Sequence, residues 1–254
     1  MAKIYLYKMT VDNGGAPCVY DGKLSLAICK PAIRMSAEKG DIVLGFAGNS
    51  LYPETKNCLI YAIKVEDVLP GGDYYTDVYK DRPDCIYERF HGKYKRRSTA
   101  IYHHGNKDLR HDLGQSPTYK RAKVLLTTRP EDFRYWGSSC PIEYPKSYTE
   151  LATFIRKMTQ GHRVNMSSMS ESVRIETQCL LRNIWNTAET KDNTPVPFSA
   201  EHSSSPTCFS SKSWAQFRTQ LTPNALREAH SAPRKFQENT ATPVACRRLL
   251  IEGF

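Results

Sequence analysis

A short segment of the chain combines a thiol, two cations and the start of a helix. In Cys29-Lys30-Pro31-Ala32-Ile33-Arg34, Pro31 suits the first turn of a helix, because its missing N–H is not needed there. The pattern predicts a helix over residues 31–38. Lys30 and Arg34 lie four residues apart, so they would share one helix face and could receive a phosphate or a carboxylate. The alternative is a solvated basic helix end that binds nothing.

Cys29 itself has two readings. Beside Lys30 and ahead of a helix, its thiol could have a lowered pKa and act as a nucleophile. Cysteines in such positions are also common as small apolar fillers. No G-x-S-x-G, P-loop or recognisable pair of catalytic carboxylates occurs in the chain, so the sequence predicts a binding site more clearly than a reaction.

A second group of chemistry-bearing residues lies within one ten-residue stretch, at His103, His104, Asp108, His111 and Asp112. The stretch contains neither H-x-x-x-H nor H-E-x-x-H, and we predict no metal site. His104 or His111 could act as a general base, with Asp112 or Asp108 fixing its tautomer. A solvated loop of mixed charge is the alternative.

Asp84 precedes the short apolar segment Cys85-Ile86-Tyr87. If that segment is a strand, the carboxylate lies at the start of the strand and could accept a proton. The same residue could instead close the turn that Arg82-Pro83 begins, which needs no chemistry.

The charge of the chain suggests a polyanionic partner. Its formal net charge is +10 over 254 residues, and cations concentrate at Arg89 to Arg97 and at Lys120 to Lys123. Tyrosines such as Tyr87 lie between them, a combination that can hold phosphates by charge and bases by stacking. The alternative is a basic surface with half-buried tyrosines. No apolar run is long enough to span a membrane, and the eight cysteines form no C-x-x-C pair. We therefore expect reduced thiols inside the cell, in the cytoplasm or the nucleus.

Apolar patterning predicts an α+β domain over residues 1–188. Its sheet should be bent and mixed or antiparallel, or a partial β-barrel, with two helices packed on it. Residues 189–254 are rich in Ser and Pro and should form a flexible or loosely docked tail, a possible site for a protein partner. The expected strands cover residues 3–8, 24–29, 41–47, 58–65, 85–89 and 123–128, with an extended segment at 133–137, and the expected later helices cover 148–159 and 171–186. Residues 71–120 should otherwise be mostly loop, and the glycines of residues 12–17 could let that turn approach a ligand closely.

Several of these segments together resemble a known family. They are Gly15-Ala16-Pro17, Leu26 to Arg34, Gly40 to Gly45, Leu59 to Val65, Arg82 to Tyr87, the histidine segment with Asp112, and Val124-Leu125-Leu126 leading into Phe133 to Gly137. The sequence resembles the second type of nucleotide-modification-associated domain, over roughly residues 3–165. It is also similar, less closely, to PUA-like domains, which read RNA or modified bases.

The family resemblance implies a nucleic acid or nucleotide ligand, with DNA favoured over RNA, and a role in modifying a DNA base. It carries over Lys30, Arg34, Asp84, His104 and Asp112 as site positions. In this reading Lys30 and Arg34 hold phosphate with Cys29 beside them, Asp84 and His104 handle protons, and Asp112 orients the histidine. The alternative is a non-catalytic reader that stacks a flipped base on Tyr87 or Trp136. The sequence identifies no cofactor.

Overall fold

The computed structural model describes residues 2–51, 56–70, 72–98, 100, 108–138, 142–144, 146–159, 163–165 and 168–186. The chain divides into a unit of Met1–Ser205 and a unit of Pro206–Phe254. Everything from residue 187 onward lies outside the described residues, so the predicted tail stays a prediction.

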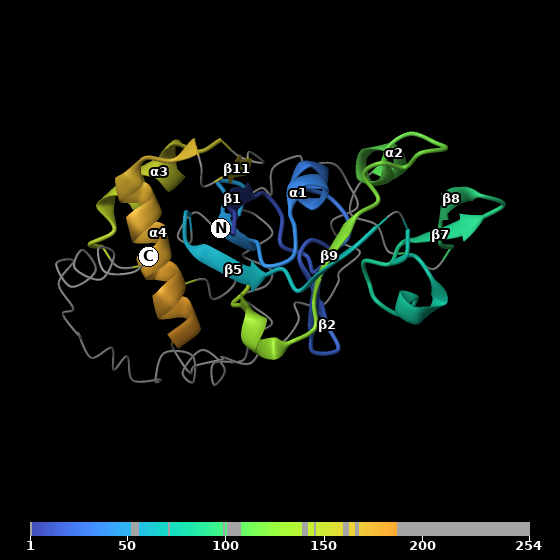
Figure 1. The fold of residues 1–254 in the computed structure, drawn as a ribbon, viewed down its shortest axis with the longest axis horizontal. Coiled ribbons are helices and arrows are strands. Elements are labelled where there is room, and N and C mark those ends of the chain that lie inside the picture. Colours follow the sequence, from blue (N-terminus) through green and yellow to red (C-terminus); the bar gives the residue numbers. More distant parts are fainter. Residues whose placement is uncertain are drawn as a thin grey trace, which may run out of the picture. The chain divides into compact units, whose positions relative to one another are not determined.

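A five-stranded mixed sheet forms the centre of the fold (Figure 1). Its strands, in spatial order, are β10 (Phe133–Tyr135), β5 (Leu59–Lys64), β4 (Ile42–Ala47), β1 (Ile4–Met9) and β11 (Arg163–Asn165). The β1 and β4 strands run parallel, and the other neighbours are antiparallel. Every residue of β1 is buried, as expected for a central strand covered on both faces.

A second sheet is antiparallel throughout. Its strands, in spatial order, are β2 (Cys18–Tyr20), β3 (Lys23–Leu26), β9 (Val124–Thr127) and β6 (Asp67–Leu69). A separate hairpin pairs β7 (Tyr87–Phe90) with β8 (Lys93–Arg96). The helices are α1 (Pro31–Ser36), α2 (Asp108–Leu113), α3 (Thr149–Lys157) and α4 (Glu171–Asn186), with single 3-10 turns at η2 (Asp77–Tyr79) and η3 (Pro130–Asp132).

Alternation along β1 sends its side chains into two different cores. Tyr5 and Tyr7 pack with Leu24 and Leu125 of the second sheet and with α1. Leu6, on the other face, packs with α3 and α4. The central sheet is therefore covered on one face by the second sheet and α1, and on the other by α3 and α4 (Figure 1). Such layers are how an α+β domain buries both faces of a sheet.

The predicted α+β class is confirmed. The mixed central sheet and the two later helices occur as expected, and none of the three sheets closes into a barrel within the described residues. The interval 71–120 holds the expected short strand, at β7, and more regular structure than we expected, because β8 and α2 also fall within it. Short elements of this kind carry few aliphatic residues, so apolar patterning does not reveal them. In the part of the chain that the structure describes, no helix has the length and apolar character that crossing a bilayer requires.

Candidate functional site

The turn between β3 and α1 is strained. Cys29 has φ 56° and Lys30 has φ 42°, so two consecutive residues other than glycine occupy the left-handed region. Each such residue costs about 1 to 3 kcal/mol and persists only where surrounding contacts enforce it. Lys30 is the residue preceding the first turn of α1, with Pro31 following it. Strain of this kind is concentrated at functional sites.

Arg34 holds this turn from inside the protein. Its side chain is fully buried, and its Nε donates a 2.7 Å hydrogen bond to the carbonyl of Cys29. Its Nη1 donates to the carbonyls of Arg121 and Lys123 at 2.7 and 2.6 Å, and its Nη2 donates to the carbonyl of Asp112 at 2.8 Å. Every nitrogen of the guanidinium is thus bonded within the protein. In this conformation Arg34 has no access to the phosphate that the sequence assigned to it.

Asp112, on α2, holds the same turn from the other side. Its carboxylate accepts hydrogen bonds from the backbone N–H of Cys29 at 2.7 Å and from the hydroxyl of Tyr87 at 2.9 Å. It also lies 3.9 Å from the Arg34 guanidinium, and both side chains are fully buried. Removing one partner of such a buried ion pair leaves a buried charge without compensation, which is strongly destabilising. The pair therefore fixes the conformation of the Cys29-Lys30 turn.

Lys30 is the cation that the turn presents. Its Nζ lies 4.7 Å from the centre of the Tyr7 ring, a cation–π distance. The side chain is half-buried, and burial lowers the pKa of Lys30 while neighbouring Cys29 raises it. Lys30 makes no ion pair with any carboxylate among the described residues. A desolvated ammonium without a carboxylate is suited to an anionic ligand.

Tyr7 belongs to a row of residues that crosses the central sheet. Strand register places Tyr7 beside Gly45, Gly45 beside Tyr61, and Tyr61 beside Tyr135. The hydroxyls of Tyr7 and Tyr61 share a 2.8 Å hydrogen bond. Gly45 makes room for this contact, because a Cβ there would lie 2.2 Å from Cε1 of Tyr61. We call Tyr7, Tyr61 and Tyr135 the tyrosine row.

The loop after β1 reaches the far end of the tyrosine row through Asp12, and it also carries the buried amide of Asn13. The Asp12 carboxylate accepts hydrogen bonds from the Tyr135 hydroxyl at 2.9 Å and from the Ser138 N–H at 2.7 Å. Burial raises the pKa of Asp12, and those hydrogen bonds only partly oppose the shift. Asn13 is 5% exposed, and its buried Nδ2 finds no acceptor among the described residues. Because buried amides are normally bonded, this donor is available to a ligand.

The phenols of the row remain neutral over a wide pH range. Burial raises the pKa of Tyr7, and the nearby Tyr61, Asp12 and Cys29 raise it further. Burial raises the pKa of Tyr61 and of Tyr135 as well. Because Asp12 acts electrostatically on Tyr7 and on Tyr61, the cation and the carboxylate both border one group of neutral hydroxyls. The arrangement can hold an anion at Lys30, donate hydrogen bonds, and exchange a proton at Asp12.

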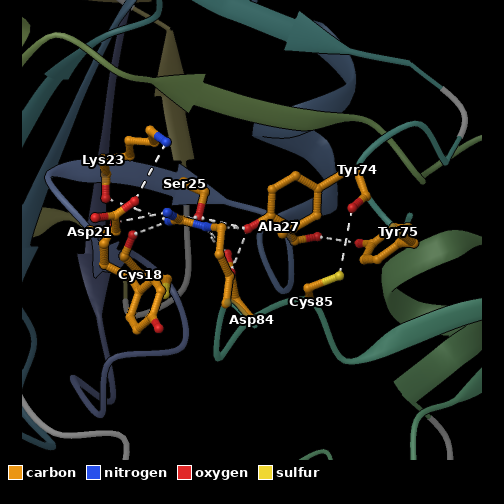
Figure 2. A network of polar contacts seen from close by, with 11 residues as sticks. Cys18, Asp21, Lys23, Ser25, Ala27, Tyr74, Tyr75, Asp84 and Cys85 are labelled. Carbon is orange, nitrogen blue, oxygen red and sulfur yellow. Dashed lines mark hydrogen bonds and ion pairs between the residues drawn. The ribbon is translucent and has the colours of Figure 1, made fainter. Parts of the chain in front are cut away.

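Asp84 lies in a different network, which Figure 2 shows together with Ser25 and Tyr74. The Asp84 carboxylate is fully buried and accepts hydrogen bonds from the hydroxyls of Ser25 at 2.6 Å and Tyr74 at 2.5 Å. Arg82 lies 3.7 Å from it and also bonds Ser25, Tyr74 and three backbone carbonyls of the β2–β3 hairpin. This arrangement ties the loop after η2 to the second sheet. The Asp84 carboxylate itself is closed to solvent, whereas Arg82 lines a pocket together with Tyr20 and Tyr79.

Tyr75 lies between the two buried ion pairs. It adjoins Tyr74 in Figure 2 and donates a 2.9 Å hydrogen bond to the carbonyl of Ala27. Its ring packs edge-on against that of Tyr87 at 5.4 Å. The two networks are therefore joined through one aromatic side chain.

The structure brings together five of the eight residues that the sequence singled out: Cys29, Lys30, Arg34, Tyr87 and Asp112. Trp136 instead packs with the core that faces α3 and α4, on the other side of the central sheet from Tyr7. Tyr87 is buried with its hydroxyl on Asp112, so neither aromatic is placed to stack on a base at Lys30. His104 lies outside the described residues.

Sequence reasoning missed Asp12, Asn13 and the tyrosine row as site residues. Two features of the sequence nevertheless pointed toward them. The loop over residues 12–17 was expected to approach a ligand because of its glycines, and Gly45 interrupts an apolar strand, where glycine marks a close approach.

Metal-binding groups and free thiols are few. Among the described residues, no group of three His, Cys, Asp or Glu side chains could hold a metal ion. Cys18, Cys29, Cys58 and Cys85 form no disulfide. Cys179, on α4, is disulfide-bonded, so the expectation of uniformly reduced thiols is wrong at this position.

Comparison with known protein families gives a match. The family model described as nucleotide modification associated domain 2 matches residues 1–202. No curated protein and no solved structure matches the chain.

Proposed function

Because the chain belongs to the nucleotide modification associated domain 2 family, we propose that it binds a nucleotide at Lys30 and modifies its base. The nucleotide is free or part of a DNA strand. The family connects the chain with nucleotide modification, and the site supplies groups that suit both a phosphate and a base.

A single observation supports this proposal most strongly. The Lys30 ammonium is half-buried against Tyr7 and has no carboxylate partner among the described residues. The strained turn that carries it is held by a buried Arg34–Asp112 pair. A protein that stabilises such a cation at this cost gains most when an anion such as a phosphate neutralises it.

The base would lie along the tyrosine row, between Lys30 and Asp12. The Asn13 amide has an unused donor that could bond a base carbonyl. Asp12 has a raised pKa, and a carboxyl of that kind can take a proton from, or return one to, a base near neutral pH. We assign Arg34 and Asp112 positioning roles, because each acts on Lys30 through the Cys29 backbone.

Calorimetric titration of the full chain with the common deoxynucleoside monophosphates, and with hydroxymethylated deoxycytidine monophosphate, tests the binding site. Lys30→Gln should lower the affinity at least tenfold. Lys39→Gln, which removes an exposed cation just beyond α1, is the matched control and should bind as the wild type does. Equal affinities of the two variants would contradict the proposal.

The modifying activity needs a separate test. Nucleosides released from the DNA of cells that produce the chain can be compared by mass spectrometry with those from cells that produce Asp12→Asn. A new nucleoside that depends on Asp12 is expected. If the DNA is identical in both while nucleotide binding at Lys30 persists, the chain is a non-catalytic reader.

A further inference from the structure

The β7–β8 hairpin lies apart from the nucleotide site and carries a concentrated positive charge. In Figure 1 it extends beyond β9, at the opposite end of the described fold from α3 and α4. Its exposed side chains are those of Arg89, Phe90, His91, Lys93, Lys95 and Arg96. The only carboxylate on the hairpin, Glu88, is paired with Lys95 at 3.2 Å and with Arg97 at 3.6 Å.

Strand pairing separates the hairpin into two faces. Tyr87 pairs with Arg96 and Arg89 with Tyr94, so these four side chains share one face. Glu88, Phe90, Lys93 and Lys95 form the other. Arg89 and Lys93 make no ion pair with any described residue, so their charges are available to an external anion.

Phe90 stands at the tip of this ribbon. Its side chain is 53% exposed, and the Lys95 ammonium lies 4.1 Å from the centre of its ring. The His91 ring is 4.2 Å away and meets it edge-on. About half of this large apolar side chain therefore stays in water among cations, so covering that half against a partner would be favourable. It suits a partner that offers both phosphates and apolar contacts.

The base of the hairpin is held rigidly. The Tyr87 hydroxyl bonds Asp112, and Tyr94 packs edge-on against Tyr119 at 4.8 Å and against Tyr75 at 5.8 Å. The Tyr119 hydroxyl also accepts a 3.2 Å hydrogen bond from the Tyr94 N–H. These contacts fix the root of the ribbon while its tip stays in solvent.

We propose that the β7–β8 hairpin is a ribbon that enters the major groove of B-form duplex DNA. This rests on the proposed function and names its substrate, a nucleotide within double-stranded DNA. The major groove, about 12 Å wide and 8.5 Å deep, admits a two-stranded β-ribbon. Four residues in each strand span roughly 13 Å at about 3.3 Å per residue. Arg89 and Lys93 contact phosphates, and Phe90 reaches the base edges, where thymine methyls offer apolar contact.

B-form DNA fits these features better than RNA does. The major groove of an A-form RNA duplex is deep and narrow, and side chains do not read it. A ribbon that only collected phosphates would bind both duplexes alike. Preference for the DNA duplex is therefore the property that identifies groove entry.

Fluorescence anisotropy of the full chain with a labelled DNA duplex tests the proposal, over about 50 to 200 mM salt. The double variant Arg89→Gln/Lys93→Gln should weaken binding roughly tenfold for each phosphate that it no longer neutralises, and it should reduce the salt slope by about 2. Phe90→Ser should weaken binding without changing the salt slope. The matched control Lys39→Gln/Lys157→Gln removes the same charge from exposed positions elsewhere, and it should keep the wild-type slope.

An RNA duplex of the same sequence provides the second arm, and it should bind more weakly than DNA. Equal loss of affinity in the hairpin and control variants, or equal affinity for DNA and RNA duplexes, overturns the proposal. Both hairpin variants should bind deoxynucleoside monophosphates as the wild type does. If neither the wild type nor any variant binds those monophosphates, the proposed nucleotide site is wrong. That result is independent of whether the hairpin binds DNA.

Discussion

The backbone N–H of Cys29 donates a 2.7 Å hydrogen bond to the carboxylate of Asp112, 83 residues further along the chain. The other oxygen of that carboxylate accepts from Tyr87 at the root of the β7–β8 hairpin. One buried side chain therefore links the turn that presents Lys30 to the element that we propose contacts DNA. A change that weakens this linkage should disturb the turn as well as the protein's stability.

Arg34→Lys should destabilise the protein by about 3 to 5 kcal/mol, because a single ammonium cannot replace four guanidinium hydrogen bonds and leaves Asp112 poorly paired. Urea unfolding measures this loss. Arg156→Lys, at an exposed position on α3, is the matched control and should change stability by less than about 0.5 kcal/mol. A loss below about 1 kcal/mol for Arg34→Lys would show that the protein does not need the Arg34 hydrogen bonds and the ion pair with Asp112.

Tyr87→Phe should weaken nucleotide binding although Tyr87 does not face Lys30. The change removes one hydrogen bond to Asp112, costs about 1 to 3 kcal/mol in stability, and loosens the Cys29-Lys30 turn. Tyr148→Phe also removes one hydroxyl contact, to Asn183 on α4, and is the control for an ordinary tyrosine truncation. Calorimetry should find normal nucleotide affinity in Tyr148→Phe alone. Identical nucleotide affinities in the two variants would mean that the hydrogen bond between Tyr87 and Asp112 does not affect the binding site.

Gly45→Ala should displace the Tyr61 ring, since the new Cβ would lie 2.2 Å from Cε1 and 2.6 Å from Cδ1. Overpacking of this kind costs about 1 to 3 kcal/mol, and it should break the hydrogen bond between Tyr61 and Tyr7. A double-mutant cycle with Tyr61→Ala isolates the clash. Gly45→Ala should cost much less in the Tyr61→Ala background. If Gly45→Ala costs the same stability in both backgrounds, the loss does not come from a clash with the Tyr61 ring.

Asp12→Asn should remove a pH-dependent part of the protein's stability. Burial raises the pKa of Asp12 above its ordinary value of 3.8, so the folded state binds the proton more tightly than the unfolded state does. The contribution of Asp12 to stability is then full below pH 3.8 and is lost as pH rises through the folded-state pKa. Urea unfolding of wild type and Asp12→Asn across that range should show a difference that grows with pH. A constant difference would contradict the raised pKa.

Tyr135→Phe provides a second test of the raised pKa of Asp12. The Tyr135 hydroxyl donates a hydrogen bond that lowers the pKa of Asp12. Its removal should extend the pH-dependent loss of stability to higher pH. An unchanged pH profile would mean that the hydroxyl does not act on Asp12.

Local patterning was enough to predict most elements of the fold. The apolar residues of β1, β4 and β5 and the stripes of α3 and α4 lie where alternation and helical spacing placed them. The segment from Cys29 to Arg34 was also singled out as one motif, and its residues lie together at one turn. Its internal roles were not visible, because a cation four residues from Lys30 was expected to face solvent with it.

The rest depends on contacts between distant residues. Arg34 is buried because the carbonyls of Arg121 and Lys123 and the side chain of Asp112 surround it, and no local pattern reveals that. The tyrosine row exists only through strand register, which places Tyr7, Gly45, Tyr61 and Tyr135 side by side. Single tyrosines in buried strands look like ordinary core residues.

The pH dependence of nucleotide binding tests the central claim, that the Lys30 ammonium receives the anion. Burial lowers the pKa of free Lys30, and a bound phosphate would raise it again. Affinity for a deoxynucleoside monophosphate should therefore fall by up to about tenfold per pH unit once the pH exceeds the pKa of free Lys30. Lys30→Arg, which stays charged throughout, should bind with no such fall. A flat profile in the wild type, or the same fall in Lys30→Arg, would contradict the account.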